Sequence, residues 1–286
     1  MTVSVLVPSS LAREATDKRE ATRKTGYVAR AATVFRVDRL TVFPDPDGAG
    51  EFGDGFVETV LRYAATPPYL RKEVWGTRDE LEYAGVLPPL RVATRTGSGS
   101  EGSGSLRQGI VTEVGADGRV RVNCGLQHPI SLPVPDGMEP AEGERVSVRV
   151  SSREPVRAKL VDEPLPGYAV DATDLDSAVT REDAGLTIAA SRHGSRLRPS
   201  RLDELAEATS TTAGDDASVD REFTVAFGAP ERGLPAILDV PPGSIREEGE
   251  TGRFDLWLNT VPNQGSGVVR TEEAMFATLA CLNLME

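Results

Sequence analysis

The order of two hydrophobic patterns along this chain restricts the folds that it can adopt. Near the N-terminus, the apolar segment SVLVP (4–8) precedes a stretch in which apolar residues from Val28 to Phe35 recur at helical spacing. The segment RLTVFPD (39–45) then has the composition of a strand that runs into a turn. Strand, helix and strand in this order predict the opening of a parallel α/β sheet.

The middle of the chain has a different pattern. A Gly/Ser-rich linker (94–105) is followed by two alternating runs around the turn GADG (115–118), which predict a hairpin. Two further alternating runs, at 144–152 and 155–162, complete a small all-β module. A five-stranded barrel of the OB type is the favoured form, and such barrels often bind RNA or single strands. Few aromatic residues are available for base stacking here, so a rigid spacer stays open as an alternative.

After this module the α/β pattern returns at GYAV (167–170). Strands are predicted at 186–191, 223–228 and 254–262, and the last helix is expected to begin with Thr271 as its N-cap. An α/β domain interrupted by a β module accounts for this order. The predicted parts are 1–91 for the first half of the α/β domain, 92–162 for the inserted barrel, and 163–286 for the second half.

Composition narrows the class of protein further. The chain of 286 residues has no uninterrupted apolar run of membrane-spanning length and no basic, apolar leader, so neither a membrane partner nor a secretory signal is expected. Two cysteines and two histidines predict a reducing, cytoplasmic location and no metal site. The net charge of −12 argues against non-specific nucleic-acid binding, but two local basic stretches, 13–39 and 191–201, leave room for specific contacts.

Three of the predicted strands end in bends that contain glycine: AAS-RHGS, AFG-APERGLP and LNT-VPNQGSG. In parallel sheets the ligand crevice lies at the carboxyl ends of the strands, and glycine lets the backbone approach a ligand closely. Neither phosphate-binding fingerprint, GxxxxGK[ST] or GxGxxG, is present. Each bend alone has the simpler interpretation of an ordinary turn, but the three together favour a site for an uncharged heterocycle.

These motifs resemble the SPOUT superfamily of RNA methyltransferases, which use S-adenosylmethionine. GYVARAATVFRVDRLTVF (26–43) looks like its first motif, FGAPERGLP (227–235) its second, and the segment from LNTVPNQGSG to the last helix its third. The branch with a β-barrel inserted in the α/β domain is the most similar, and 66–91 also resembles it. The chain departs from this pattern at the Gly/Ser linker, at 202–222, and at Pro230, where many members carry Glu.

The resemblance implies a trefoil knot near the C-terminus, S-adenosylmethionine as cofactor, an RNA substrate and a homodimer. It also implies a cofactor pocket made of residues in the three bends. They are Ser191, Gly228, Pro230, Arg232, Gly233, Leu234, Asn259, Thr260, Val261, Pro262, Gln264, Gly265, Val268, Val269 and Thr271.

Two arginines are the candidates for catalysis. Arg30 matches the motif arginine that acts at the RNA target in the superfamily, and a purely structural arginine is the alternative. Arg270, just before the last helix, is placed to contact the cofactor carboxylate or an RNA phosphate. The RNA-binding candidates are Arg23, Lys24, Arg192, Arg196 and Arg198. Glu272 and Glu273 are explained more simply as helix-capping charges than as proton acceptors, and a lone histidine such as His193 is more often structural than catalytic.

The sequence thus predicts an S-adenosylmethionine-dependent RNA methyltransferase acting on a base of ribosomal or transfer RNA, with N3 of a uridine suggested by the family. A non-catalytic RNA-binding or ribosome-assembly factor that keeps the knotted fold is the alternative. A kinase or dehydrogenase is disfavoured because the phosphate-binding motifs are missing.

Overall fold

The computed structural model describes residues 2–48, 52–53, 55–90, 92, 104–211, 220–242, 245 and 253–285. They form two compact units. The sheet unit comprises Met1–Ala64, Asp79–Leu90 and Tyr168–Glu286, and the barrel unit comprises Ala65–Arg78 and Arg91–Gly167. The predicted Gly/Ser linker lies outside the described residues except for its last two, and the domain boundaries drawn from the sequence stay a prediction.

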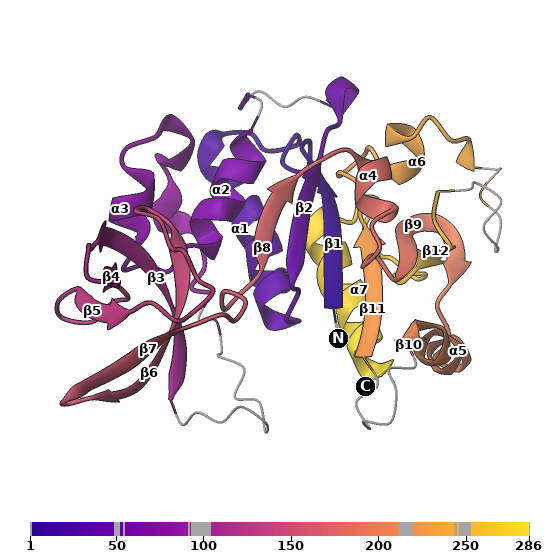
Figure 1. Cartoon of the computed structure of the whole chain (residues 1–286). Coiled ribbons are helices and arrows are strands. Elements are labelled where there is room, and N and C mark those ends of the chain that lie inside the picture. The colour runs from indigo at the N-terminus through magenta and orange to yellow at the C-terminus, as the bar shows by residue number, and fades with distance from the viewer. Residues whose placement is uncertain are drawn as a thin grey trace. The chain divides into compact units, whose positions relative to one another are not determined.

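The sheet unit is built on a parallel sheet, as Figure 1 shows. Its strand order is β12 (Leu256–Asn259), β9 (Leu186–Arg196), β11 (Asp220–Ala226), β1 (Thr2–Pro8), β2 (Arg39–Phe43) and β8 (Ala169–Ala172). Every pairing along this order is parallel. The short β10 (Ser210–Thr211) pairs antiparallel with β11. The predicted parallel α/β sheet is confirmed, whereas the trefoil knot stays a prediction.

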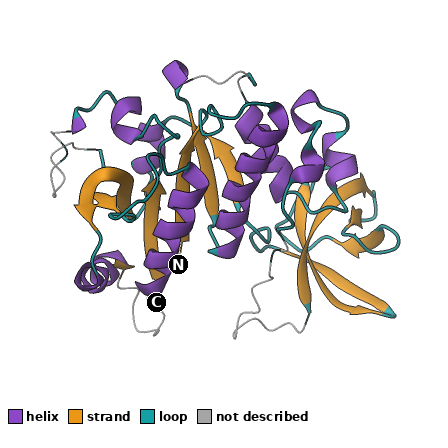
Figure 2. Cartoon of the chain, turned by 180° about the vertical axis from the view of Figure 1, so that it is seen from behind, coloured by secondary structure: helices purple, strands orange, loops and turns teal. Residues whose placement is uncertain are grey.

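Helices cover the sheet. They are α1 (Lys18–Val34), α2 (Phe56–Ala65), α4 (Leu175–Val179), α5 (Pro199–Thr209), α6 (Leu234–Ile237) and α7 (Thr271–Leu282). Asp17 caps α1 by accepting a hydrogen bond from the Glu20 N–H at 2.6 Å. The apolar face predicted for this helix is fully buried at Val28, Ala31 and Ala32. Helices α1 and α7 contact each other, and Figure 2 shows them from the side of the sheet that they cover.

The start of α7 corrects one prediction. Arg270, not Thr271, is the N-cap residue, and the Glu273 carboxylate accepts a hydrogen bond from the Arg270 N–H at 2.9 Å. Thr271 occupies the first helical position, and its hydroxyl donates to the Gly228 carbonyl at 2.8 Å. The threonine therefore ties the last helix to the end of β11 instead of capping its own helix.

One buried cluster of the sheet unit gathers apolar side chains from several of these strands. Leu6, Ala226 and Trp257 belong to one buried cluster, so residues from β1, β11 and β12 share a single apolar interior. Trp257 is only 1% exposed, and its ring packs edge-on against Phe254 at 5.7 Å between centroids. This packing holds the ends of the strands in place, and the candidate site is built on them.

The barrel unit is an antiparallel five-stranded sheet, as predicted. Its order is β5 (Ile130–Pro133), β4 (Arg119–Asn123), β3 (Ser105–Val114), β6 (Arg145–Arg153) and β7 (Val156–Val161). The outer strands β5 and β7 contact each other, so the sheet curls into a nearly closed barrel. Strand β5 has no separate prediction in the sequence because its alternating run is only four residues long. The short helix α3 (Arg71–Trp75) also belongs to this unit.

Candidate functional site

The three bends predicted from the sequence line one cavity in the sheet unit. Its volume is about 270 Å³, near the lower end of the range for small-molecule sites. Residues 190–193 of β9, the loop after β11 and the loop after β12 all contribute to its wall. The cavity lies at the carboxyl ends of parallel strands, where the topology of an open α/β sheet leaves a crevice.

A bulge in β9 forms the first wall. Strand β12 pairs in register up to Trp257 opposite Ala189, and then the register shifts so that Leu258 lies opposite Ser195. The intervening residues leave the ladder and lie against the cavity. Gly194 permits this path, because a Cβ there would lie 2.6 Å from the Leu258 nitrogen.

The loop after β11 forms the second wall and closes tightly on itself. A Cβ on Gly228 would lie 2.6 Å from the Cα of Gly233 and from the nitrogen of Leu234. Ala229 and Arg232 exchange backbone hydrogen bonds of 3.0 and 3.2 Å across the tip. Glycine at 228 is therefore needed by the loop itself, so a bulky residue at 228 is a poor probe of the cavity.

The loop after β12 forms the third wall, and hydrogen bonds connect it to the other two. The Asn259 amide donates to the Arg192 carbonyl at 3.0 Å and accepts from the Val261 N–H at 3.1 Å. The Thr260 and Thr278 hydroxyls lie 2.8 Å apart. Together with the bond from Thr271 to Gly228, these contacts connect all three bends around the cavity.

Most of the predicted cofactor residues lie at this cavity. The lining includes Ser191, Gly228, Gly233, Asn259, Thr260, Val261, Gln264, Val268, Val269 and Thr271. The others lie elsewhere: Pro230 and Leu234 are buried, Arg232 is ion-paired, Pro262 is half-buried, and Gly265 is exposed, with nothing within 4 Å of where a Cβ would lie. Ala229 and Glu231, which fall within the predicted segment 228–234, also line the cavity, whereas the sequence did not single out Ala190, Phe227, Pro235, Ala236, Pro242, Gly267 and Ala274. Helical spacing from Thr271 gives a signal for Ala274, three residues later.

Glu231 is the acidic residue of this loop that lines the cavity. It lines the cavity one residue after Pro230, with a positive φ of 62° that a residue other than glycine seldom adopts. The neighbouring Arg232 holds this conformation in place. Its Nε lies 3.1 Å from both carboxylate oxygens of Asp45, which is 2% exposed and also accepts from the Ser10 hydroxyl at 2.5 Å. Arg232 thus supports the loop and does not line the cavity.

His193 is the second titratable group in the lining. Burial, and then the positive charge of Arg192, lower the pKa of its imidazole from 6.5, so it is mainly neutral at neutral pH. The Arg192 Nε lies 3.1 Å from the His193 Nε2 and donates to it. The ionisable side chains of the lining are therefore one carboxylate, one neutral imidazole and the Arg192 guanidinium.

The predicted catalytic arginines do not line the cavity. Arg30 Nη1 donates to the carbonyls of Leu90 at 2.8 Å and Pro89 at 3.2 Å. Arg270 is exposed, and its Nε lies 3.2 Å from the Glu14 carboxylate. Both contacts are the kind that a structural arginine makes, and they leave the roles of these residues as predictions.

The predicted RNA-binding residues differ in exposure. Arg23, Arg192, Arg196 and Arg198 are exposed, and Arg192 also lines the cavity. Lys24 is 3% exposed, and its ammonium lies 2.8 Å from Glu14 and 3.2 Å from Glu20. A buried, doubly paired ammonium is not available to a phosphate, so we leave Lys24 out of the proposed RNA contacts.

Glu272, next to the cavity, is a buried carboxylate. It is 7% exposed, its Oε2 has no hydrogen-bond partner among the described residues, and burial raises the pKa of its carboxyl above 4.5. Because the folded state holds this proton more tightly than the unfolded state, ionisation at neutral pH costs stability. We expect Glu272→Gln to raise the free energy of unfolding at pH 7 by about 1 kcal/mol.

The size of this effect depends on pH. Below 4.5, Glu272 is protonated in both states, so the gain from the glutamine should fade as the pH falls toward that value. Urea unfolding of both proteins at several pH values measures it. The adjacent Glu273→Gln is the control, since Glu273 is exposed and caps the helix, and it should give no gain. A gain for Glu272→Gln that grows toward acid pH would contradict this account.

A metal site and a membrane span each require a particular arrangement of residues. No group of three or more His, Cys, Asp or Glu side chains among the described residues is arranged to hold a metal ion. None of the described helices combines the length and the apolar run that crossing a bilayer requires.

Comparison with known proteins identifies the family. The family described as "Putative RNA methyltransferase" matches residues 2–282. An uncharacterized protein of Haloarcula marismortui is 71% identical over 289 residues and one of Halobacterium salinarum is 63% identical over 292, both over the full length of each chain. The 28S rRNA (uridine-N(3))-methyltransferase of Homo sapiens is 30% identical over 318 residues, covering 98% of this chain and 77% of the human protein. The chain belongs to this RNA methyltransferase family.

Proposed function

We propose that this protein transfers a methyl group from S-adenosylmethionine to a base of ribosomal or transfer RNA, with N3 of a uridine in ribosomal RNA as the first target to test. The observation that carries the proposal is the single cavity at which three glycine-containing strand ends meet, in a chain of an RNA methyltransferase family. The human relative's name supports uridine N3. A homodimer and a C-terminal knot are part of the same proposal.

The residues at the cavity suit this cofactor. The wall consists mainly of backbone, glycine, alanine and small polar side chains, which suits an uncharged heterocycle better than a phosphate. The Glu231 carboxylate favours a cationic group close to it. When bound, S-adenosylmethionine supplies a methyl group on a positively charged sulfur, already activated for transfer. The protein's task is then to bind the donor, to align the acceptor and to exclude water.

Transfer to uridine N3 requires a base. The new N–CH₃ bond replaces an N–H bond, so the N3 proton must leave while the methyl group moves from sulfur to nitrogen. Glu231 is the lining group able to accept that proton, because the acceptor nitrogen of the neutral His193, Nε2, already accepts a hydrogen bond from Arg192. Arg30 and Arg270 are proposed to align the RNA or to stabilise negative charge that develops on the base.

Two loop glycines provide a matched test of the cavity. Gly267 lines it and Gly265 does not, and a Cβ at either position meets nothing within 4 Å. We expect Gly267→Leu to fill the cavity and to weaken S-adenosylmethionine binding by about tenfold or more, since overpacking costs ~1–3 kcal/mol. Gly265→Leu should bind as the unaltered protein does. Calorimetric titration measures both affinities. Equal affinities for the two variants would show that S-adenosylmethionine does not bind in this cavity.

A labelling experiment tests the reaction. The protein is incubated with methyl-labelled S-adenosylmethionine and total RNA from a strain that lacks the gene, and the RNA is digested to nucleosides for mass spectrometry. Labelled 3-methyluridine is the expected product. RNA binding without any transfer, at every salt concentration tried, would instead favour a non-catalytic assembly factor.

A further inference from the structure

The barrel unit contains a second, larger hollow that the proposed reaction does not use. A groove of about 700 Å³ lies along strands β4, β5, β6 and β7, and its lining residues all fall between 119 and 159. Strands β5 and β7 are the two outer strands of the sheet, so the groove follows the seam at which the barrel nearly closes.

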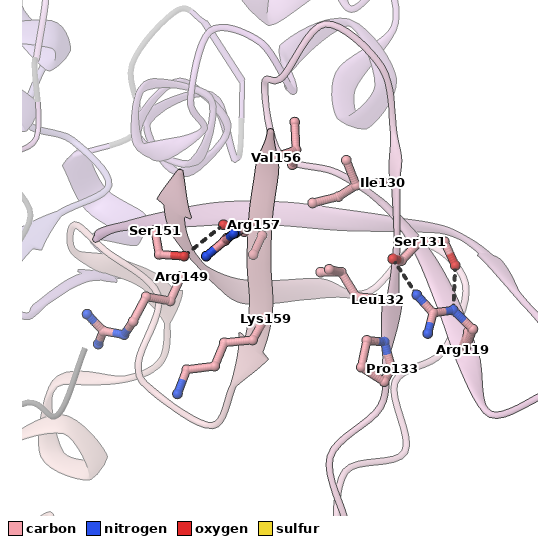
Figure 3. Close-up of a pocket in the computed structure, with 11 residues that line it drawn as sticks. Arg119, Ile130, Ser131, Leu132, Pro133, Arg149, Ser151, Val156, Arg157 and Lys159 are labelled. Carbon is pink, nitrogen blue, oxygen red and sulfur yellow. Dashed lines mark hydrogen bonds between the residues drawn. The ribbon is translucent and has the colours of Figure 1, made fainter. Parts of the chain in front are cut away.

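The floor of the groove is apolar. Figure 3 shows Ile130 and Val156 facing each other across the seam, with Leu132 below them. Val156 is 48% exposed, so much of its apolar side chain is open to an occupant of the groove. An occupant that covers this floor gains apolar contact as well as any charge interaction.

The sides of the groove are cationic. Arg119 is held in place by Ser131, because its Nε donates to the serine hydroxyl at 2.9 Å and its Nη2 to the serine carbonyl at 2.8 Å. Arg157 and Lys159 are exposed, and within the part of the chain that the structure describes their charged groups have no hydrogen-bond or ion-pair partner. The fourth cation, Arg149, is buried and neutralised by Glu163.

Three available cations thus face the groove, and no acidic side chain is among the lining residues, all of which are described. This concentration of positive charge stands out in a chain whose net charge is −12. An apolar floor between cationic sides matches a single polynucleotide strand, whose riboses and bases cover the floor while its phosphates reach the cations. A duplex keeps its bases stacked inside and leaves such a floor uncovered.

We propose that this groove binds a single-stranded segment of RNA through its sugar–phosphate backbone. The choice of RNA over other polyanions rests on the proposed function, whereas the groove and its charges do not. No aromatic side chain is among the lining residues, so base stacking contributes little, and the groove should hold RNA with weak sequence preference. It adds affinity for the substrate beyond that of the methyl-transfer cavity.

The test removes the two unpartnered cations with Arg157→Gln/Lys159→Gln in the full chain. The control is Arg121→Gln/Lys72→Gln, which makes the same change in net charge within the barrel unit at exposed residues that do not line the groove. Binding of a fluorescein-labelled single-stranded RNA of about 12 nucleotides is followed by anisotropy over a series of salt concentrations. Thermal melting confirms that both variants fold.

The expected result is a change in the salt dependence. Each phosphate contact on a single strand contributes about −0.7 to the slope of log K against log salt, so losing two contacts should make the slope less negative by about 1.4. The control pair should keep the slope of the unaltered protein. Equal changes in both pairs, or no change in either, overturns the proposal. A polyglutamate peptide that displaces the RNA at equal concentration also overturns it, since the groove would then select an acidic peptide.

This outcome is separable from that of the proposed function. If the groove variant binds RNA as the unaltered protein does, and the protein also binds S-adenosylmethionine, the groove proposal fails and the proposed function is unaffected. If the unaltered protein binds no S-adenosylmethionine and the groove pair still flattens the slope, the proposed reaction fails and the RNA groove stands.

Discussion

Replacing Arg232 with methionine is expected to lower the free energy of unfolding by about 3 kcal/mol at neutral pH, because it leaves a buried carboxylate without its cationic partner. Asp45 follows β2 and its side chain is 1% exposed, while Arg232 lies in the loop after β11. The Ser10 hydroxyl, which follows β1, bonds to the same carboxylate. One ionised group therefore joins the ends of three strands, and urea unfolding measures what its loss costs.

Two further variants show whether the buried charge is the cause. Arg253→Met removes an arginine that pairs with Asp176 at 2.6 Å, but Arg253 is only half-buried and Asp176 is exposed, so about 1 kcal/mol or less is expected. The double variant Asp45→Asn/Arg232→Met should recover most of the loss, because no uncompensated charge is left in the interior. If the double variant is as unstable as Arg232→Met, lost packing explains the effect and the ion pair does not.

Replacing Arg30 with methionine is expected to reduce kcat/KM for RNA methylation by about 100-fold while leaving the affinity for S-adenosylmethionine unchanged. Arg30 lies on α1 and does not line the cavity, so the effect is expected on the RNA and not on the cofactor. Among the described residues only its Nη1 is hydrogen-bonded, which leaves two other nitrogens for a phosphate or a base. Steady-state kinetics, cofactor titration and thermal melting are needed together.

A structural role for Arg30 gives a different set of results. Losing the two bonds to the carbonyls of Pro89 and Leu90 should cost about 1–2 kcal/mol of stability, with kcat/KM nearly unchanged. Arg30→Lys should keep part of the activity if charge at the RNA matters. Arg19→Met is the control, since Arg19 is an exposed arginine on the same helix and should change neither activity nor stability. Destabilisation without a kinetic defect would end the catalytic proposal for Arg30.

Much of the architecture was predictable because it depends on local periodicity. The alternation in RVRVN predicted β4, and the apolar spacing from Val28 predicted the buried face of α1. The end of a helix is harder to predict, because it depends on which side chain another element engages. Thr271 has the composition of an N-cap, yet its hydroxyl bonds to Gly228 in a distant loop, and Arg270 takes the cap position.

Part of the candidate site was likewise predictable from local sequence, and part of it depends on tertiary contacts. Three glycine-containing bends after apolar runs, and the absence of phosphate-binding motifs, followed from residue order alone, since such bends are local and parallel strands bring their carboxyl ends to one edge. The wall residues Pro242 and Ala274, the support of Arg232 by Asp45, and the burial of Lys24 did not follow from it. The cationic groove of the barrel unit is of the same kind, because Arg119 and Lys159 are 40 positions apart in the chain and share a surface only after the sheet has curled. Such contacts join residues distant in sequence, and their energies depend on burial and distance, which are properties of the folded chain.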